Sequence, residues 1–70
     1  MSWTNAFHGV QQRVLNPRSF ATVVEYSPTL AESSVYNIDT NQHYDQQTFR
    51  GKNAAAKARK YIDERNPNRR

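Results

Sequence analysis

The chain has 70 residues, no cysteine and a formal net charge of +4. That length allows one small domain near the lower limit for folding unaided, and the missing thiols exclude disulfides and thiolate metal sites. No apolar run approaches the ~18 residues of a membrane span and no signal-peptide pattern opens the chain. We therefore expect no membrane association and a cytoplasmic location, in the host cytoplasm if the protein is viral.

The charge is unevenly distributed along the chain. Residues 1–49 carry two basic and four acidic side chains, a net −2, whereas residues 50–70 carry eight basic and two acidic ones, a net +6. Such asymmetry points to an anionic partner. The same lysines and arginines would also solvate a helix and complement its C-terminus.

The N-terminal segment fits two interpretations. Its large apolar residues recur with the spacing of one helical face, which favours a helix: Trp3, Phe7, Val10 and Val14. Alternatively residues 10–15 form a strand, and the turn sequence at 16–19 (NPRS) leads into the next one. We expect the helix, with a boundary at Asn16-Pro17 in either case. Trp3 and Phe7 are expected to fold onto the sheet and complete the core, and the alternative is an exposed apolar patch that marks an interaction site.

Three later segments alternate in polarity and are rich in β-branched or aromatic residues, which is typical of strands. They are residues 20–27 (FATVVEYS), 34–40 (SVYNIDT) and 43–49 (HYDQQTF). Residues 28–34 (PTLAESS) are expected to form a loop. In the last strand a bulge or a twist would let both Tyr44 and Phe49 reach the core.

Residues 54–66 predict a helix, because three alanines are followed by strong helix formers. Asn53 is the expected N-cap, and Pro67 ends the helix. At 100° per residue the expected buried arc consists of Ala54, Ala55, Ala58, Tyr61 and Ile62. The opposite arc consists of Lys57, Arg59, Lys60, Asp63 and Glu64.

The predicted fold class is therefore α+β. A three-stranded antiparallel sheet is followed by a C-terminal helix packed on one face, and an N-terminal helix or extra strand precedes them. Residues 1–66 would form the single domain, and residues 67–70 a basic tail.

Signals for catalysis are poor. The two histidines, His8 and His43, lie far apart without a surrounding motif, and no nucleophile, base or Gly-rich phosphate loop accompanies the carboxylates. A chain this short also has little room for the ~300 Å³ pocket of a small-ligand site. We expect a non-enzyme without a cofactor or a metal.

The strand order, with TF, a glycine and then a helix ending KARKYID, resembles small DNA-binding domains of the AP2 type and of integrase arm-binding modules. The resemblance covers residues 20–65. It implies a sheet that enters the major groove with arginines and lysines. Here the predicted strands carry Glu25, Asp39 and Asp45 and no basic residue before Arg50, so the resemblance supports the topology and not groove reading by the sheet.

The sequence favours a binding protein, of the phage-encoded or regulatory inhibitor kind, that docks on a larger protein or protein–nucleic acid complex. The alternative is a nucleic-acid-binding protein that contacts DNA or RNA phosphates through the basic helix and tail. A second copy of the chain is a further partner that would complete a thin core. The predicted partner-binding residues are six cations and two aromatic anchors: Arg50, Lys52, Lys57, Lys60, Arg69, Arg70, Trp3 and Tyr44.

Overall fold

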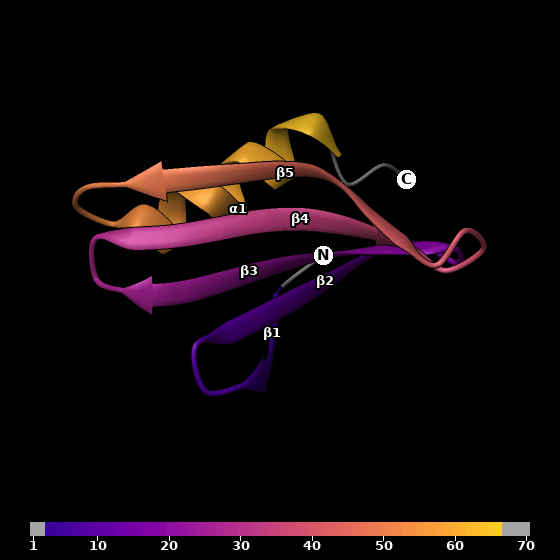
Figure 1. Ribbon diagram of the computed structural model, residues 1–70, viewed down its shortest axis with the longest axis horizontal. Coiled ribbons are helices and arrows are strands. Elements are labelled where there is room, and N and C mark those ends of the chain that lie inside the picture. The colour runs from indigo at the N-terminus through magenta and orange to yellow at the C-terminus, as the bar shows by residue number, and fades with distance from the viewer. Residues whose placement is uncertain (1–2, 67–70) are drawn as a thin grey trace.

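The computed structural model describes residues 3–66, which form five strands followed by one helix (Figure 1). The strands are β1 (Thr4–Phe7), β2 (Val10–Asn16), β3 (Ser19–Ser27), β4 (Leu30–Asn37) and β5 (Gln42–Arg50), and the helix is α1 (Ala54–Arg65). The strands form an antiparallel meander in the order β1-β2-β3-β4-β5. Helix α1 packs against β3, β4 and β5 on one face of the sheet. The predicted α+β class is confirmed.

The sheet has five strands, so the prediction of three was wrong. The expected N-terminal helix is instead the hairpin β1–β2, and the alternative of a strand from residue 10 is confirmed. Gly9 permits this hairpin, because it has a φ of 76° and a Cβ at this position would lie 3.2 Å from the carbonyl oxygen of Glu25. The apolar spacing that indicated a helix distributes large residues along two antiparallel strands instead.

The segment 28–34, expected to be a loop, belongs mainly to strand β4. Only Pro28 and Thr29 turn the chain, and the amide of Thr29 donates a hydrogen bond to the Ser27 hydroxyl at 3.2 Å. Ala31, Ser33 and Val35 then alternate inward and are all buried. Small and hydroxyl side chains at buried positions made this strand resemble a loop.

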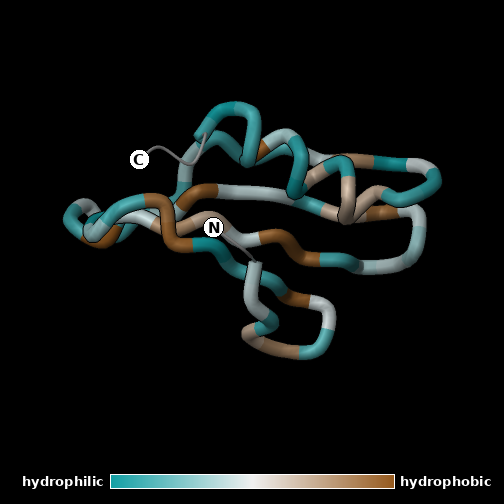
Figure 2. The backbone as a smooth tube through the Cα atoms, turned by 180° about the vertical axis from the view of Figure 1, so that it is seen from behind, coloured by the Kyte–Doolittle hydropathy of each residue, from teal (hydrophilic) through white to brown (hydrophobic). Residues whose placement is uncertain are grey.

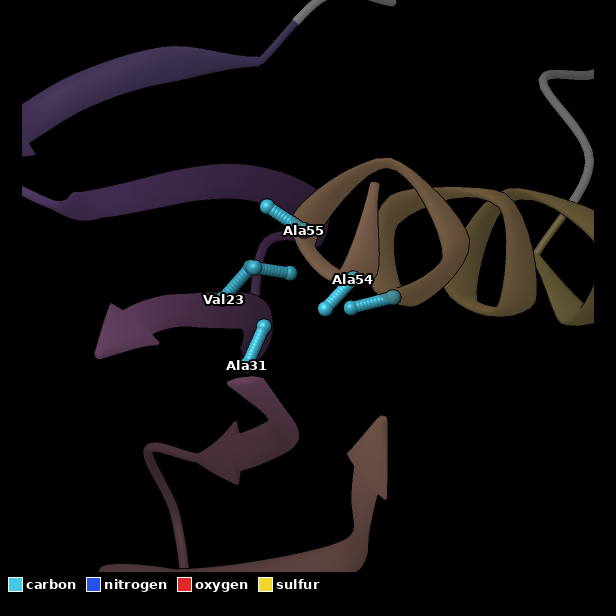
Figure 3. Close-up of a cluster of buried hydrophobic side chains, with 5 residues drawn as sticks. Val23, Ala31, Ala54 and Ala55 are labelled. Atoms are coloured by element: carbon cyan, nitrogen blue, oxygen red, sulfur yellow. The ribbon is translucent and has the colours of Figure 1, made fainter. Parts of the chain in front are cut away.

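The core lies between α1 and one face of the sheet. Directly paired positions across the strands share this face, as in the row Arg13, Ala21, Val35 and Tyr44. Five of the eight buried apolar residues are alanines, which lets the helix approach the strands closely. Figure 3 shows the alanines of α1 facing Val23 of β3 and Ala31 of β4.

The expected bulge in β5 is present. Asp45 has a φ of 54°, and the pairing with β4 shifts between Ser33 and Val35. The shift puts Tyr44 and Phe49 on the helix side, opposite Val35 and Ala31. Phe49 packs against the core as expected, whereas Tyr44 stays 51% exposed.

The orientation of α1 agrees with the predicted arc. Ala54, Ala55, Ala58 and Ile62 are buried, and Tyr61 is half-buried. Asn53 occupies the N-cap position, but it adopts the left-handed conformation and its side chain makes no capping hydrogen bond. The helix ends at Arg65, with Asn66 as its C-cap, as expected from the proline that follows.

Candidate binding surfaces

Four exposed cations follow one another where β5 turns into α1 and along the outer side of the helix: Arg50, Lys52, Lys57 and Lys60. We refer to this set as the basic edge. The Lys57 Nζ donates to the Arg50 carbonyl oxygen at 3.2 Å, so the two residues lie against the same turn. Lys60 lies 4.0 Å from Glu64, a wide and exposed pair. Within residues 3–66, no carboxylate lies within ion-pairing distance of Arg50, Lys52 or Lys57.

Four arginines outside the basic edge have intramolecular partners. Arg18 pairs with Asp39 at the sheet end, and the Arg59 guanidinium donates to the Gln11 side-chain oxygen at 2.6 Å. Arg65 stacks over the Tyr61 ring at 4.5 Å. Arg13, the fourth, pairs with Asp63. The positive charge left unengaged in the described part of the chain therefore concentrates on the basic edge.

Arg13 is almost fully buried beneath the C-terminal half of α1. Its guanidinium donates to the Asp63 carboxylate at 2.6 Å and to the Asn66 carbonyl oxygen at 2.7 Å. The helix prediction put Asp63 and Arg59 on the solvent side. Both instead contact β2 along one flank of the helix, because Arg13 and Gln11 reach across from that strand.

Trp3 packs against the core, and its indole nitrogen donates to the Asp63 carboxylate at 3.2 Å. The expectation that this residue completes the core is confirmed. Phe7 was expected to do the same and does not, since it is 73% exposed. Of the two predicted aromatic anchors, only Tyr44 is exposed, and Arg69 and Arg70 lie outside the described residues.

Tyr44 lies at the opposite end of β5 from Arg50. Next to it, the Tyr61 hydroxyl donates to the Asp45 carboxylate at 2.8 Å. Partial burial and this carboxylate raise the pKa of Tyr61, while Arg65 works in the opposite direction. The basic edge and Tyr44 thus lie along the same side of the molecule, with Tyr61 and Arg65 between them.

The sheet face opposite α1 is a second surface, which we name the open face. At one end of this face Leu30 pairs with Arg50, and three cross-strand rows follow, given by the strand pairing. The first is Val10, Val24, Glu32 and Thr48; the middle row is Gln12, Thr22 and Ser34; the third is Val14, Phe20, Tyr36 and His43. None of these residues is buried. Sequence reasoning missed this surface because β2 was expected to be helical.

Aromatic rings line the third row. Phe20 and Tyr36 have ring centroids 5.3 Å apart, and Tyr36 and His43 are 4.9 Å apart. The Ser34 hydroxyl hydrogen-bonds to the Nδ1 atom of His43 at 3.2 Å. Figure 2 shows apolar brown segments along the strands, whereas α1 is mostly hydrophilic.

The described residues contain no cluster of three or more histidine and carboxylate side chains that could hold a metal ion. Helix α1 is too short and too polar to cross a membrane. Neither family models nor curated proteins nor solved structures gave a match to this chain. The basic edge and the open face are therefore the two surfaces from which a function can be proposed.

Proposed function

We propose that this protein is a non-enzymatic binding protein, of the phage-encoded or regulatory inhibitor kind, that docks on an acidic surface of a larger protein. The observation that carries the proposal is the basic edge, whose Arg50, Lys52 and Lys57 are exposed without an acidic partner in the described residues. A surface of like charges costs some repulsion in the free protein, and an acidic partner relieves it. Tyr44 supplies an aromatic contact on the same side.

The alternative partner is a nucleic acid. The same four cations, together with Arg69 and Arg70 of the tail, would neutralise several phosphates. We rank this second, because Arg50 is the one cation that the strand pairing of the described residues places on the sheet face opposite α1. An experiment must therefore decide whether the partner is a protein or a nucleic acid.

The test changes Lys52, Lys57 and Lys60 together to glutamate. Circular dichroism should remain native, since all three side chains are exposed, while capture of a protein partner from a nuclease-treated lysate should be lost. The matched control changes the same three lysines to arginine, which keeps the charge and should keep binding. Retained binding by the glutamate variant would show that the basic edge serves solubility alone.

A DNA duplex with a fluorescent label distinguishes the two partners. Phosphate contacts predict an affinity that falls linearly with salt on logarithmic axes, with a slope of roughly −0.9 for each contact. We expect weak binding with little sequence preference. Tight DNA binding that disappears in the glutamate variant would replace the protein partner by the nucleic-acid alternative.

A further inference from the structure

We propose that the open face is the interface of a twofold symmetric homodimer. The helix covers one side of the sheet, and the other side presents Val10, Phe20, Val24 and Tyr36 half-exposed and Val14 62% exposed. Contiguous apolar patches larger than a few hundred Å² are rare on soluble monomers and mark interfaces.

The size of the face fits such an interface. The four strands β2 to β5, ~4.8 Å apart and with roughly 25 Å of their length on this face, give a flat area of about 500 Å². Projecting side chains raise the accessible area above the flat area. One copy therefore offers on the order of the ~800 Å² per partner found in standard interfaces.

The charges of the face favour a neutral partner. Glu32 is the one carboxylate in the three rows, and it already accepts a hydrogen bond from the Tyr26 hydroxyl at 2.9 Å. Arg50 lies at one end of this face, where it pairs with Leu30, and Arg18 at the other end of the sheet is paired with Asp39. A nucleic acid would find one unpaired cation here, whereas a second copy of a face that carries one carboxylate and one cation adds no net charge.

The row pattern is self-complementary. A twofold axis can lie in the plane of the interface, perpendicular to the strands and along the middle row. The middle rows of the two copies then face each other, and the first row of each copy faces the third row of the other. The hydroxyls and amides of Gln12, Thr22 and Ser34 are both donors and acceptors, so they can bond with their own copies. Phe20 then faces Val24 of the second copy, and Glu32 faces the phenol of Tyr36.

A second copy is also the partner that is always available. An apolar face needs covering whenever the protein is free, and another copy is present at every concentration at which the protein exists. The thin, alanine-rich core on the helix side gives this chain particular need of further buried area. Dimerisation through the open face leaves Lys57 and Lys60 on the α1 side of both copies exposed, so one dimer presents two sets of these cations.

The first test is the mass of the full chain in solution, measured by light scattering at micromolar concentrations. We expect twice the mass of one chain. Thr22→Arg puts two guanidinium groups together at the symmetry axis, so this variant should have the mass of one chain and a native circular dichroism spectrum. Lys60→Glu, on the outer side of α1, is the control and should remain a dimer.

A cross-linking experiment identifies the face without depending on a disruptive variant. The chain has no cysteine, so Thr22→Cys introduces a single thiol in the middle row. Packed sheets lie ~10 Å apart, and a bismaleimide with a spacer of about that length should join two copies in high yield. Lys60→Cys should give little product.

Two results would overturn the proposal. One is a single-chain mass for the unaltered protein at high micromolar concentration. The other is a dimer that cross-links through Lys60→Cys as readily as through Thr22→Cys, because it would place the contact elsewhere. Loss of the dimer with retained partner capture would separate this interface from the proposed function.

Discussion

Arg13 and Asp63 form the most deeply placed ion pair of the described residues. The Arg13 side chain is 5% exposed and that of Asp63 is 49% exposed, so the carboxylate stays partly hydrated while the guanidinium does not. One Arg13 nitrogen, Nε, is buried without a hydrogen-bond partner. The cost of removing Asp63 therefore consists mainly of leaving a buried guanidinium without its counter-charge.

We expect Asp63→Ala to lower the free energy of unfolding by roughly 1–3 kcal/mol, since the exposed carboxylate reduces the effect of a fully buried pair. Glu64→Ala, one residue further on, removes a carboxylate whose one ion pair within residues 3–66 is the wide one to Lys60, and it should change the free energy of unfolding by a few tenths of a kcal/mol. Urea denaturation of both variants measures the difference. Equal changes would mean that the Arg13 contact contributes little.

Tyr61 predicts a dependence of stability on alkaline pH. Its pKa in the folded protein is raised above the ordinary value of 10.0 by partial burial and by Asp45. The unfolded chain therefore loses this proton first, and the contribution to stability, complete below about pH 10, is lost as pH rises through the folded pKa. Tyr26 also loses its proton in this range, because its hydrogen bond to Glu32 raises its pKa above the ordinary value.

Comparison of the wild type with Tyr61→Phe isolates the contribution of Tyr61 to the pH dependence of stability. The difference in unfolding free energy between wild type and variant should be constant below pH 10 and should shrink above it, in step with the absorbance change of tyrosinate formation. Tyr44→Phe, at an exposed site, is the control and should run parallel to wild type. Parallel curves for Tyr61→Phe as well would contradict the raised pKa.

At the level of elements, the helix and the strands β3 and β5 could be predicted from sequence, whereas β1, β2 and the first half of β4 could not. A helix of 12 residues has its signals close together, in the alanines, the apolar spacing and the proline that follows. Strand β2 has a buried arginine at its centre, and β4 has a buried serine. Both polar residues disrupt the alternation by which a strand is recognised, because their burial depends on a helix far away in sequence.

The two candidate surfaces also differ in whether they could be predicted from the sequence. The basic edge could be predicted, since its four cations lie within residues 50–60. The open face could not, since Val14, Phe20, Tyr36 and His43 become neighbours only through the pairing of four strands. Trp3 was predicted to complete the core, but its contact with Asp63 spans 60 positions and has no local signal.

The close approach of α1 to the sheet predicts the effect of enlarging its small residues. Ala58 has no exposed surface, so Ala58→Leu should lower the free energy of unfolding by about 1–3 kcal/mol through overpacking. Ala56 lies on the exposed side of the same helix, and Ala56→Leu should be nearly neutral. Thermal denaturation distinguishes them, and similar melting temperatures would mean that the helix is rotated.

At the scale of the whole molecule, the core is divided into two clusters that share Trp3. One contains Val23, Ala31 and the first alanines of α1, and the other contains Ala21, Val35 and Ile62. Trp3 packs against both, from a position just before β1. The indole therefore links the two halves of a core that has few large side chains of its own.

This position makes Trp3 a determinant of whether the chain folds at all. A domain of this size has roughly 4–10 kcal/mol of stability, and truncation of a large aromatic side chain in a core costs about 3–5 kcal/mol. Since Trp3 is half-buried, we expect Trp3→Ala to cost about 2–4 kcal/mol and to leave a substantial unfolded population at room temperature. Phe7→Ala is the matched control, because Phe7 is 73% exposed and should be worth a few tenths of a kcal/mol. Denaturant titrations followed by circular dichroism compare the two, and an unchanged midpoint for Trp3→Ala would show that the clusters hold together without the indole.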